Sequence, residues 1–213
     1  MKLVIIGANG KIGSRITEEA LNRGHSITGI VRNPDSGIKN EEVKWVKTDA
    51  LDTNALASVL KEHDAVISAF GIDWHKPETF HLFSDIAQSV INAAKKAAVK
   101  RFINVGGAGS LEVTPGVQLV DTPSFPEAWK LGADEQRRSL EVFRKEKNLE
   151  WTFFSPAIVI EPGPRTGKFR LGKDNPVFDQ KGNSTISYDD YAVALIDELE
   201  KPQFIKQRFT IGY

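Results

Sequence analysis

A glycine-rich segment near the amino terminus has the spacing of a loop that binds the pyrophosphate of a dinucleotide. It reads Gly7-Ala8-Asn9-Gly10-Lys11-Ile12-Gly13, with a glycine at every third position. In such a loop the first glycine permits a sharp turn, the second lets the backbone approach the phosphates, and the third lets the next helix pack on the strand. Free N–H groups at the helix start favour an anion. We predict a nicotinamide dinucleotide site at Gly7, Asn9, Gly10, Lys11, Ile12 and Gly13; a plain strand-to-helix turn is the alternative.

Arg32 stands 19 residues past Gly13, where dinucleotide folds that prefer NAD usually carry an acid. An arginine cannot accept a hydrogen bond from a ribose 2′-hydroxyl, but it can contact a 2′-phosphate through two N–H groups. Lys11 could add a second cation. This pattern predicts a preference for NADP(H), with NAD(H) possible. The alternative is a solvated arginine that stacks on adenine and tolerates both cofactors.

Alternating strand and helix patterns must position these groups. The expected strands cover 3–6, 26–31, 43–47, 65–70, 101–105, 151–155 and 208–211, and the expected helices cover 12–23, 53–61, 77–98, 127–147 and 188–200. Residues 33–37 form an expected turn, and 106–126 an expected loop. The alternation predicts an α/β, Rossmann-like, doubly wound parallel sheet in a single NAD(P)-binding domain spanning 1–213. The irregular, Pro- and Gly-rich segment 156–187 is expected to form a small substrate cap over the strand carboxyl ends.

Right-handed crossovers would gather the carboxyl ends of the strands at one edge of the sheet. Residues that follow those strands are therefore further candidates for cofactor contacts. For Asp49, the first of these candidates, the alternative is a role in the loop or in a helix cap near Asp52. The candidates are Asp49, Ala50 and Leu51 after the third strand, Ala69, Phe70 and Gly71 after the fourth, Val105, Gly106 and Gly107 after the fifth, and Pro156 and Ala157 after the sixth.

Composition narrows the function classes. The chain has 213 residues, with 28 Lys plus Arg balanced by 28 Asp plus Glu, so net charge gives no argument for nucleic acid or an anionic membrane. It has no cysteine, which excludes disulfides and thiolate chemistry. Because the first strand is expected at Lys2 and no apolar run approaches the ~20 residues of a membrane span, we expect a cytoplasmic protein. Its expected partner is a small-molecule acceptor, and no pattern indicates an oligomer.

Several motifs together resemble the atypical short-chain dehydrogenases of the NADH-flavin reductase group. They are the glycine loop, Val31-Arg32-Asn33-Pro34, the run from Val105 to Leu111, Ser155-Pro156-Ala157, the run from Tyr188 to Ala192, and Gln207-Arg208-Phe209-Thr210. The resemblance covers essentially the whole chain and extends, at longer range, to biliverdin reductase B and NmrA-like proteins. It implies a Rossmann fold and hydride transfer from NAD(P)H to a flavin or a similar acceptor.

The chain departs from standard short-chain dehydrogenases, which carry Tyr-x-x-x-Lys on the helix after the fifth strand. Its tyrosines are Tyr188, Tyr191 and Tyr213. Ser110 matches the superfamily's catalytic serine, although a plain loop serine is the alternative. Lys130 could stabilise negative charge on a reduced flavin, although a solvated helix lysine is the alternative. We expect Trp74 and Trp129 to contact the substrate as aromatic walls.

The leading hypothesis is an NAD(P)H-dependent oxidoreductase that reduces a flavin, quinone or similar planar acceptor. The alternative is a dinucleotide-sensing regulator without turnover, as the NmrA-like proteins imply, and a nucleotide-sugar epimerase comes last. His75 and His81 lack a companion carboxylate at metal-ligand spacing, so no metal site is expected. The acidic pairs Glu18-Glu19 and Asp189-Asp190 are interpreted as helix-surface residues.

Overall fold

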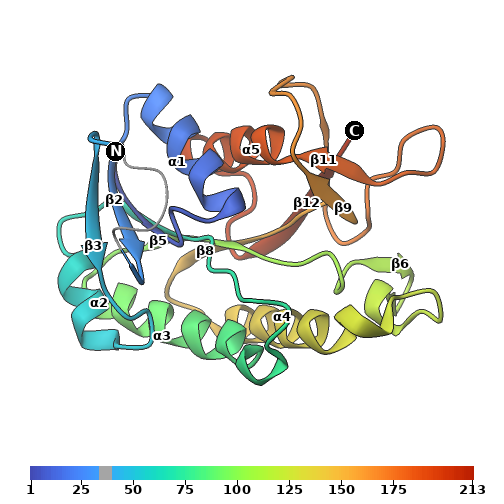
Figure 1. The fold of residues 1–213 in the computed structure, drawn as a ribbon, viewed down its shortest axis with the longest axis horizontal. Helices are drawn as coiled ribbons and strands as arrows, with labels where there is room; N and C mark the ends of the chain where they lie inside the picture. Colours follow the sequence, from blue (N-terminus) through green and yellow to red (C-terminus); the bar gives the residue numbers. More distant parts are fainter. Residues whose placement is uncertain (34–39) are drawn as a thin grey trace.

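The computed structural model describes residues 1–33 and 40–213, so the turn expected at 33–37 lies, apart from Asn33, outside the described residues. In these ranges eight strands form one sheet in the order β10-β12-β8-β5-β4-β1-β2-β3 (Figure 1). All neighbours pair in parallel except β10, which runs antiparallel to β12. The strands are β1 (Lys2–Ile6), β2 (Ser26–Val31), β3 (Val43–Lys47), β4 (Ala65–Ser68), β5 (Arg101–Val105), β8 (Glu150–Ser155), β10 (Arg170–Gly172) and β12 (Gln207–Gly212).

Helices cover both faces of this sheet, which confirms the predicted doubly wound Rossmann-like fold. Figure 1 shows α1 (Lys11–Asn22) and α5 (Tyr188–Glu200) on one face, and α2 (Thr53–Leu60), α3 (Leu82–Lys96) and α4 (Glu127–Lys145) on the other. Each face has its own core. Leu3 and Ile5 of β1 pack in the core beneath α1 and α5, whereas Val4 and Ile6 pack in the opposite core. Burial on both faces explains why the central strands are continuous apolar runs rather than alternating ones.

Two connections differ from their expected form. The helix expected from Pro77 begins with the short 3-10 helix η1 (Pro77–Thr79), and α3 itself starts at Leu82. The expected loop at 106–126 contains the hairpin β6 (Glu112–Thr114) and β7 (Val117–Gln118), followed by the 3-10 helix η2 (Leu119–Asp121). Across the described ranges, no helix has both the length and the apolar character required to cross a membrane.

The segment 156–187 is attached to the rest of the fold along its length. It contributes β10 to the edge of the main sheet, and its strands β9 (Val159–Glu161) and β11 (Thr185–Ser187) pair in parallel. An ion pair with the buried carboxylate of Glu19 adds to this attachment. Arg165 binds both carboxylate oxygens of Glu19 on α1, at 2.8 and 2.9 Å. Glu19 is 5% exposed, so its interpretation as a surface acid was wrong. The sequence did not reveal this, because its partner Arg165 lies 146 residues further along the chain.

Asp190 was also misinterpreted as a surface acid, for its side chain is fully buried at the start of α5. It accepts hydrogen bonds from the N–H groups of Thr166 (2.8 Å) and Gly167 (2.7 Å). The hydroxyls of Thr166 and Tyr213 donate to its second oxygen. Burial alone would raise the pKa of Asp190, but these four hydrogen bonds outweigh it and hold the pKa below its ordinary value.

We predict that Asp190→Asn lowers the free energy of unfolding at pH 7 by about 2–3 kcal/mol, because a neutral amide replaces a carboxylate that accepts several charge-assisted bonds. The folded-state pKa is depressed, so the carboxylate stabilises the fold above the unfolded pKa of about 3.9, and this contribution is lost as the pH falls through the folded pKa. The difference between wild type and variant should therefore shrink in acid. Urea unfolding at pH 7 and in acid, with Asp189→Asn as the matched control, measures this; equal losses for the two variants would contradict the assignment.

Candidate dinucleotide-binding site

The loop from β1 to α1 passes very close to the end of β4. Gly7 has a φ of +75°, in the left-handed region that favours glycine, and its N–H donates to the Ile30 carbonyl of β2 at 2.9 Å. A Cβ atom on Gly7 would lie 2.6 Å from the Ala69 carbonyl oxygen, and one on Gly13 would overlap the Gly7 carbonyl oxygen. Glycine at these two positions therefore lets the ends of β1, β2 and β4 meet around the loop.

The amino terminus of α1 is open. Gly10 caps the helix without a side-chain hydrogen bond, no acidic residue lies in the first turn, and Gly10 and Lys11 are exposed. The first N–H groups of a helix have no partner within it, and the helix dipole adds positive potential there. The close glycine cradle and the open helix end together fit the pyrophosphate of a dinucleotide. Within this cradle Gly10 is less tightly confined than Gly7 and Gly13, since its Cβ would lie 3.2 Å from the Gly7 oxygen, a contact that a shift of a few tenths of an ångström would relieve.

The residues predicted from the second and third strands lie where those strands end. Arg32 directly follows β2 and is exposed, and in the described residues its side chain takes part in no ion pair. Asp49, after β3, accepts a hydrogen bond from the Leu51 N–H at 2.9 Å. This hydrogen bond supports the alternative of a loop role for Asp49, while a contact between Asp49 and adenine stays a prediction. Ala50 is buried and Leu51 is exposed.

The glycines after β5 lie against side chains inside the protein, Gly106 against an aromatic ring and Gly107 against the end of a flexible glutamine. A Cβ atom on Gly106 would overlap the Phe153 ring, and one on Gly107 would overlap the Gln136 side chain of α4. The Gly106 N–H also donates to the Phe154 carbonyl of β8 at 2.8 Å. This packing accounts for the glycines without a ligand, so cofactor contacts by Val105, Gly106 and Gly107 stay predictions.

The end of β8 holds an unpartnered polar atom that the sequence analysis missed. Ser155 is completely buried, and its Oγ makes no hydrogen bond within the described residues. A buried hydroxyl without a partner costs about 1–3 kcal/mol, so it calls for a reason. Next to it, Pro156 and Ala157 are buried, and the Pro156 carbonyl accepts from Thr210 at 3.2 Å. Ser155 therefore adds a polar group at the strand end where the nicotinamide was expected.

A small void of about 10 Å³, with room for about one water molecule, lies between the carboxyl ends of β4 and β5 and the helices α3 and α4. It combines polar and aromatic side chains, and it is lined in part by Ser68, Phe70, Phe83, Asn104 and Gln136. Ser68 and Asn104 are register partners on neighbouring strands and lie on the same face. A polar residue that ends an otherwise apolar strand was the pattern that could have identified Ser68, whereas Asn104 precedes the last residue of a strand that begins with Arg101.

Aromatic rings extend from this pocket to the surface. The Phe70 and Phe83 ring centroids are 6.0 Å apart, and Trp74 stacks obliquely on Phe80 at 5.5 Å and on Phe83 at 6.5 Å. Trp74 also covers Gly132 of α4, where a Cβ atom would overlap its ring, yet 42% of the residue remains exposed. The predicted wall residue Trp74 thus adjoins the pocket.

Residues predicted to be catalytic lie in different surroundings. Ser110 is 3% exposed, and Arg208 donates to its carbonyl oxygen at 2.6 Å and to its Oγ at 3.1 Å. These two hydrogen bonds from Arg208 support the alternative that Ser110 is a structural loop serine. Lys130 is exposed beside Trp129, which is 58% exposed, in the first turn of α4. Catalytic roles for Ser110 and Lys130, and substrate contact by Trp129, stay predictions. In the described ranges no group of three or more His, Asp or Glu side chains is arranged to hold a metal ion.

The fold and the glycine loop together define a Rossmann-type dinucleotide-binding protein. A family model described as NAD(P)H-binding matches residues 7–202. The chain therefore belongs to the NAD(P)H-binding family.

Three similar proteins place it more closely. The uncharacterized protein YwnB of Bacillus subtilis is 41% identical over 99% of this chain and 98% of its own length. A proposed epimerase from Bacteroides thetaiotaomicron is 46% identical, with a TM-score of 0.90 over 100% of this chain and 96% of that one. A proposed NADH-flavin reductase from Streptococcus pneumoniae TIGR4 is 40% identical, with a TM-score of 0.89 over 100% of this chain and 99% of that one. These likenesses confirm the resemblance to atypical short-chain dehydrogenases of the NADH-flavin reductase type.

We predict that Gly10→Ala weakens NADPH binding at least about tenfold, because the added methyl group occupies the surface that the pyrophosphate must approach. It should cost less stability than Gly13→Ala, because its 3.2 Å contact needs a shift of only a few tenths of an ångström. Gly13→Ala should lose both stability and binding, since its Cβ overlaps the Gly7 carbonyl oxygen. Fluorescence titration with NADPH, together with thermal unfolding, separates the two effects. Wild-type affinity in Gly10→Ala would show that the pyrophosphate does not lie over this glycine.

Proposed function

We propose that the protein is an NADPH-dependent reductase that transfers hydride to a flavin, quinone or similar planar acceptor. The observation that carries this proposal is the cluster of aromatic rings beside the ends of β4 and β5, in which Phe83 contacts both Phe70 and the half-exposed Trp74. In a doubly wound sheet that edge is where ligands bind. Family membership and the likeness to the streptococcal protein proposed as an NADH-flavin reductase support it.

The residues around the pocket suit hydride transfer to a ring. A bound NADPH supplies the hydride. Phe70, Phe83 and Trp74 would pack against a planar acceptor and exclude water from one of its faces. The helix α4 carries no tyrosine, so the usual proton donor to a carbonyl is missing. A flavin or quinone can take its proton from water, which is why we favour such acceptors. Lys130 is proposed to stabilise negative charge on the reduced acceptor.

The dinucleotide is proposed to be NADPH because Arg32 is exposed at the end of β2 with no acid on either side of it. We predict that Arg32→Ala weakens NADPH binding about 10- to 100-fold, the loss expected for a bidentate, charge-assisted contact with the 2′-phosphate. NADH binding should change less than about threefold, because NADH lacks that phosphate. Titration of both cofactors measures the ratio, with the exposed Arg138→Ala as control. An unchanged ratio would contradict the preference.

The acceptor proposal is tested by mixing the protein with NADPH and a panel of FMN, riboflavin and quinones while following the loss of reduced-nicotinamide absorbance. We predict turnover, and we predict that Trp74→Ala raises the acceptor KM by roughly tenfold through the loss of aromatic stacking. The NADPH affinity of the variant should stay near that of wild type. Val117→Ala, which also removes an exposed apolar side chain, serves as the control. Equal acceptor KM values in the Trp74→Ala and Val117→Ala variants would contradict the assignment of Trp74 to the acceptor site.

The second candidate is a dinucleotide-sensing protein without turnover. The missing tyrosine on α4 favours it, because a sensor needs no proton donor. Tight NADPH binding with no turnover across the acceptor panel would select this alternative. Epimerase activity, suggested by the likeness to the Bacteroides protein, comes third, since epimerisation of a nucleotide sugar needs the tyrosine that α4 lacks.

A further inference from the structure

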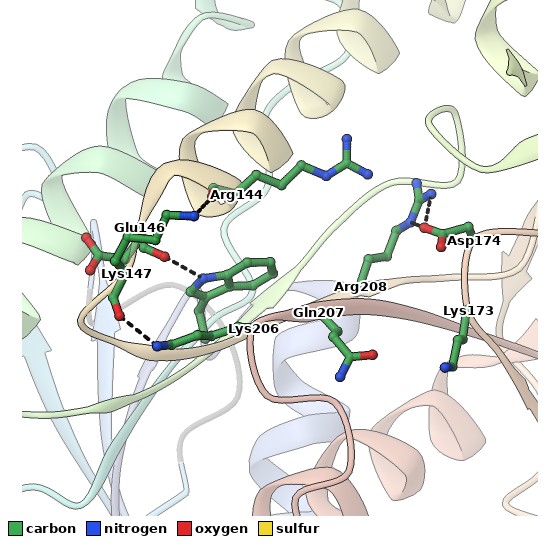
Figure 2. Close-up of a pocket in the computed structure, with 9 residues that line it drawn as sticks. Arg144, Glu146, Lys147, Lys173, Asp174, Lys206, Gln207 and Arg208 are labelled. Atoms are coloured by element: carbon green, nitrogen blue, oxygen red, sulfur yellow. Dashed lines mark hydrogen bonds and ion pairs between the residues drawn. The ribbon is translucent and has the colours of Figure 1, made fainter.

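A second cavity lies at the opposite ends of the strands from the glycine loop. It is formed where α4 ends and where β8 and β12 begin (Figure 2). The glycine loop, in contrast, follows the carboxyl end of β1. The volume of the second cavity is about 270 Å³. Five of its lining side chains are cationic, namely Arg144, Lys147, Lys173, Lys206 and Arg208, and two are carboxylates, namely Glu146 and Asp174.

Both carboxylates are already engaged. Asp174 binds Arg208 through Nε at 3.0 Å and Nη2 at 2.5 Å. Glu146 binds Lys95 and accepts from the Asn148 N–H. Burial alone would raise the pKa of Glu146, but these contacts outweigh it and hold the pKa below its ordinary value, so the carboxylate stays charged and paired. The lining side chains therefore keep an excess of three positive charges.

Contacts within the protein hold Lys147, Lys206 and Arg208, and the lysines still offer donors. Lys206 donates to the Lys147 carbonyl at 2.7 Å, and Lys147 donates to the Arg144 carbonyl at 3.3 Å, as the dashed lines in Figure 2 show. Each ammonium group has three donors, so two remain on each of these lysines. Within the described residues, Lys173 makes no side-chain hydrogen bond or ion pair. The Arg208 side chain is 2% exposed and fixed by its contacts with Asp174 and Ser110.

Stabilisation of the carboxyl end of α4 explains only part of this cluster. Cations are favoured there by the helix dipole and by the unpaired carbonyls, which accounts for Lys147 and Lys206. It does not account for Lys173, which follows β10 on the other side of the cavity. Arg144 contacts Glu141 of its own helix at 2.6 Å, but both side chains are exposed, and such pairs contribute little.

We propose that this cavity binds a small phosphate-bearing molecule, separately from the dinucleotide site. The cavity is smaller than the roughly 300–1,000 Å³ of pockets that hold drug-sized ligands, so a compact anion fits it better than a whole dinucleotide. The guanidinium group of Arg144 can bind phosphate oxygens in pairs, and the three ammonium groups supply further donors and charge. Arg208 adds charge at the floor while its donors stay committed to the protein.

The probe for this proposal is inorganic pyrophosphate, titrated calorimetrically into the full-length protein that has been saturated with NADPH. Saturation keeps the probe out of the glycine loop. We expect saturable binding that weakens as salt is added. The double variant Arg144→Ala/Lys173→Ala should bind pyrophosphate at least tenfold more weakly, with an unchanged unfolding temperature and NADPH affinity. The matched control is Arg138→Ala/Lys181→Ala, which removes an exposed arginine and an exposed lysine from elsewhere, and it should bind as wild type does.

Three results would overturn the proposal. One is the absence of saturable pyrophosphate binding in the NADPH-saturated wild type. Another is equal pyrophosphate affinity in the two double variants, which would show that the cavity cations do not hold the anion. The third is binding that appears only when NADPH is left out, which would place pyrophosphate at the glycine loop instead. Because the readout is anion binding rather than turnover, a failed reductase assay leaves this test intact.

Discussion

The loop between β1 and α1 runs so close to the end of β4 that only glycine fits at its two tightest points. At Gly7 both the positive φ and the 2.6 Å approach to the Ala69 carbonyl oxygen exclude a side chain. This close approach gathers the ends of three strands and leaves the start of α1 open to solvent. The proposed dinucleotide site therefore depends on the absence of side chains at Gly7 and Gly13. Arg32, at the end of the neighbouring strand β2, adds a positive charge to this site.

The fold could be predicted because its strongest determinant is local in sequence. A sheet that is buried on both faces needs apolar central strands, such as β1 and β4, and the predicted bounds of β2, β3 and β5 agree with the observed ones. Contacts between residues distant in sequence could not be predicted in this way. Asp190 and Glu19 look like exposed helix acids until their partners, 24 and 146 residues away, are known. The contact between Ser110 and Arg208 spans 98 residues and has the same origin.

The same residue type also serves different purposes at neighbouring strand ends. Gly7 and Gly13 shape a surface to which an anion can bind, whereas Gly106 and Gly107 make room for Phe153 and Gln136. Sequence alone could not separate these uses, because both require a small residue directly after a strand. The polar candidates Ser68, Asn104 and Ser155 were missed for a related reason: each lies at or next to the end of a buried strand, and its position at the ligand edge becomes visible only in the assembled sheet.

The central claim is that the glycine loop, Arg32 and the end of β8 bind one NADPH molecule along a single edge of the sheet. A crystal structure of the complex with NADPH tests it most directly. The account predicts the pyrophosphate over the N–H groups that start α1, the 2′-phosphate within hydrogen-bond distance of Arg32, and the nicotinamide beside Ser155 and the pocket that contains Phe70. A dinucleotide bound away from the glycine loop, or a 2′-phosphate out of reach of Arg32, would contradict it.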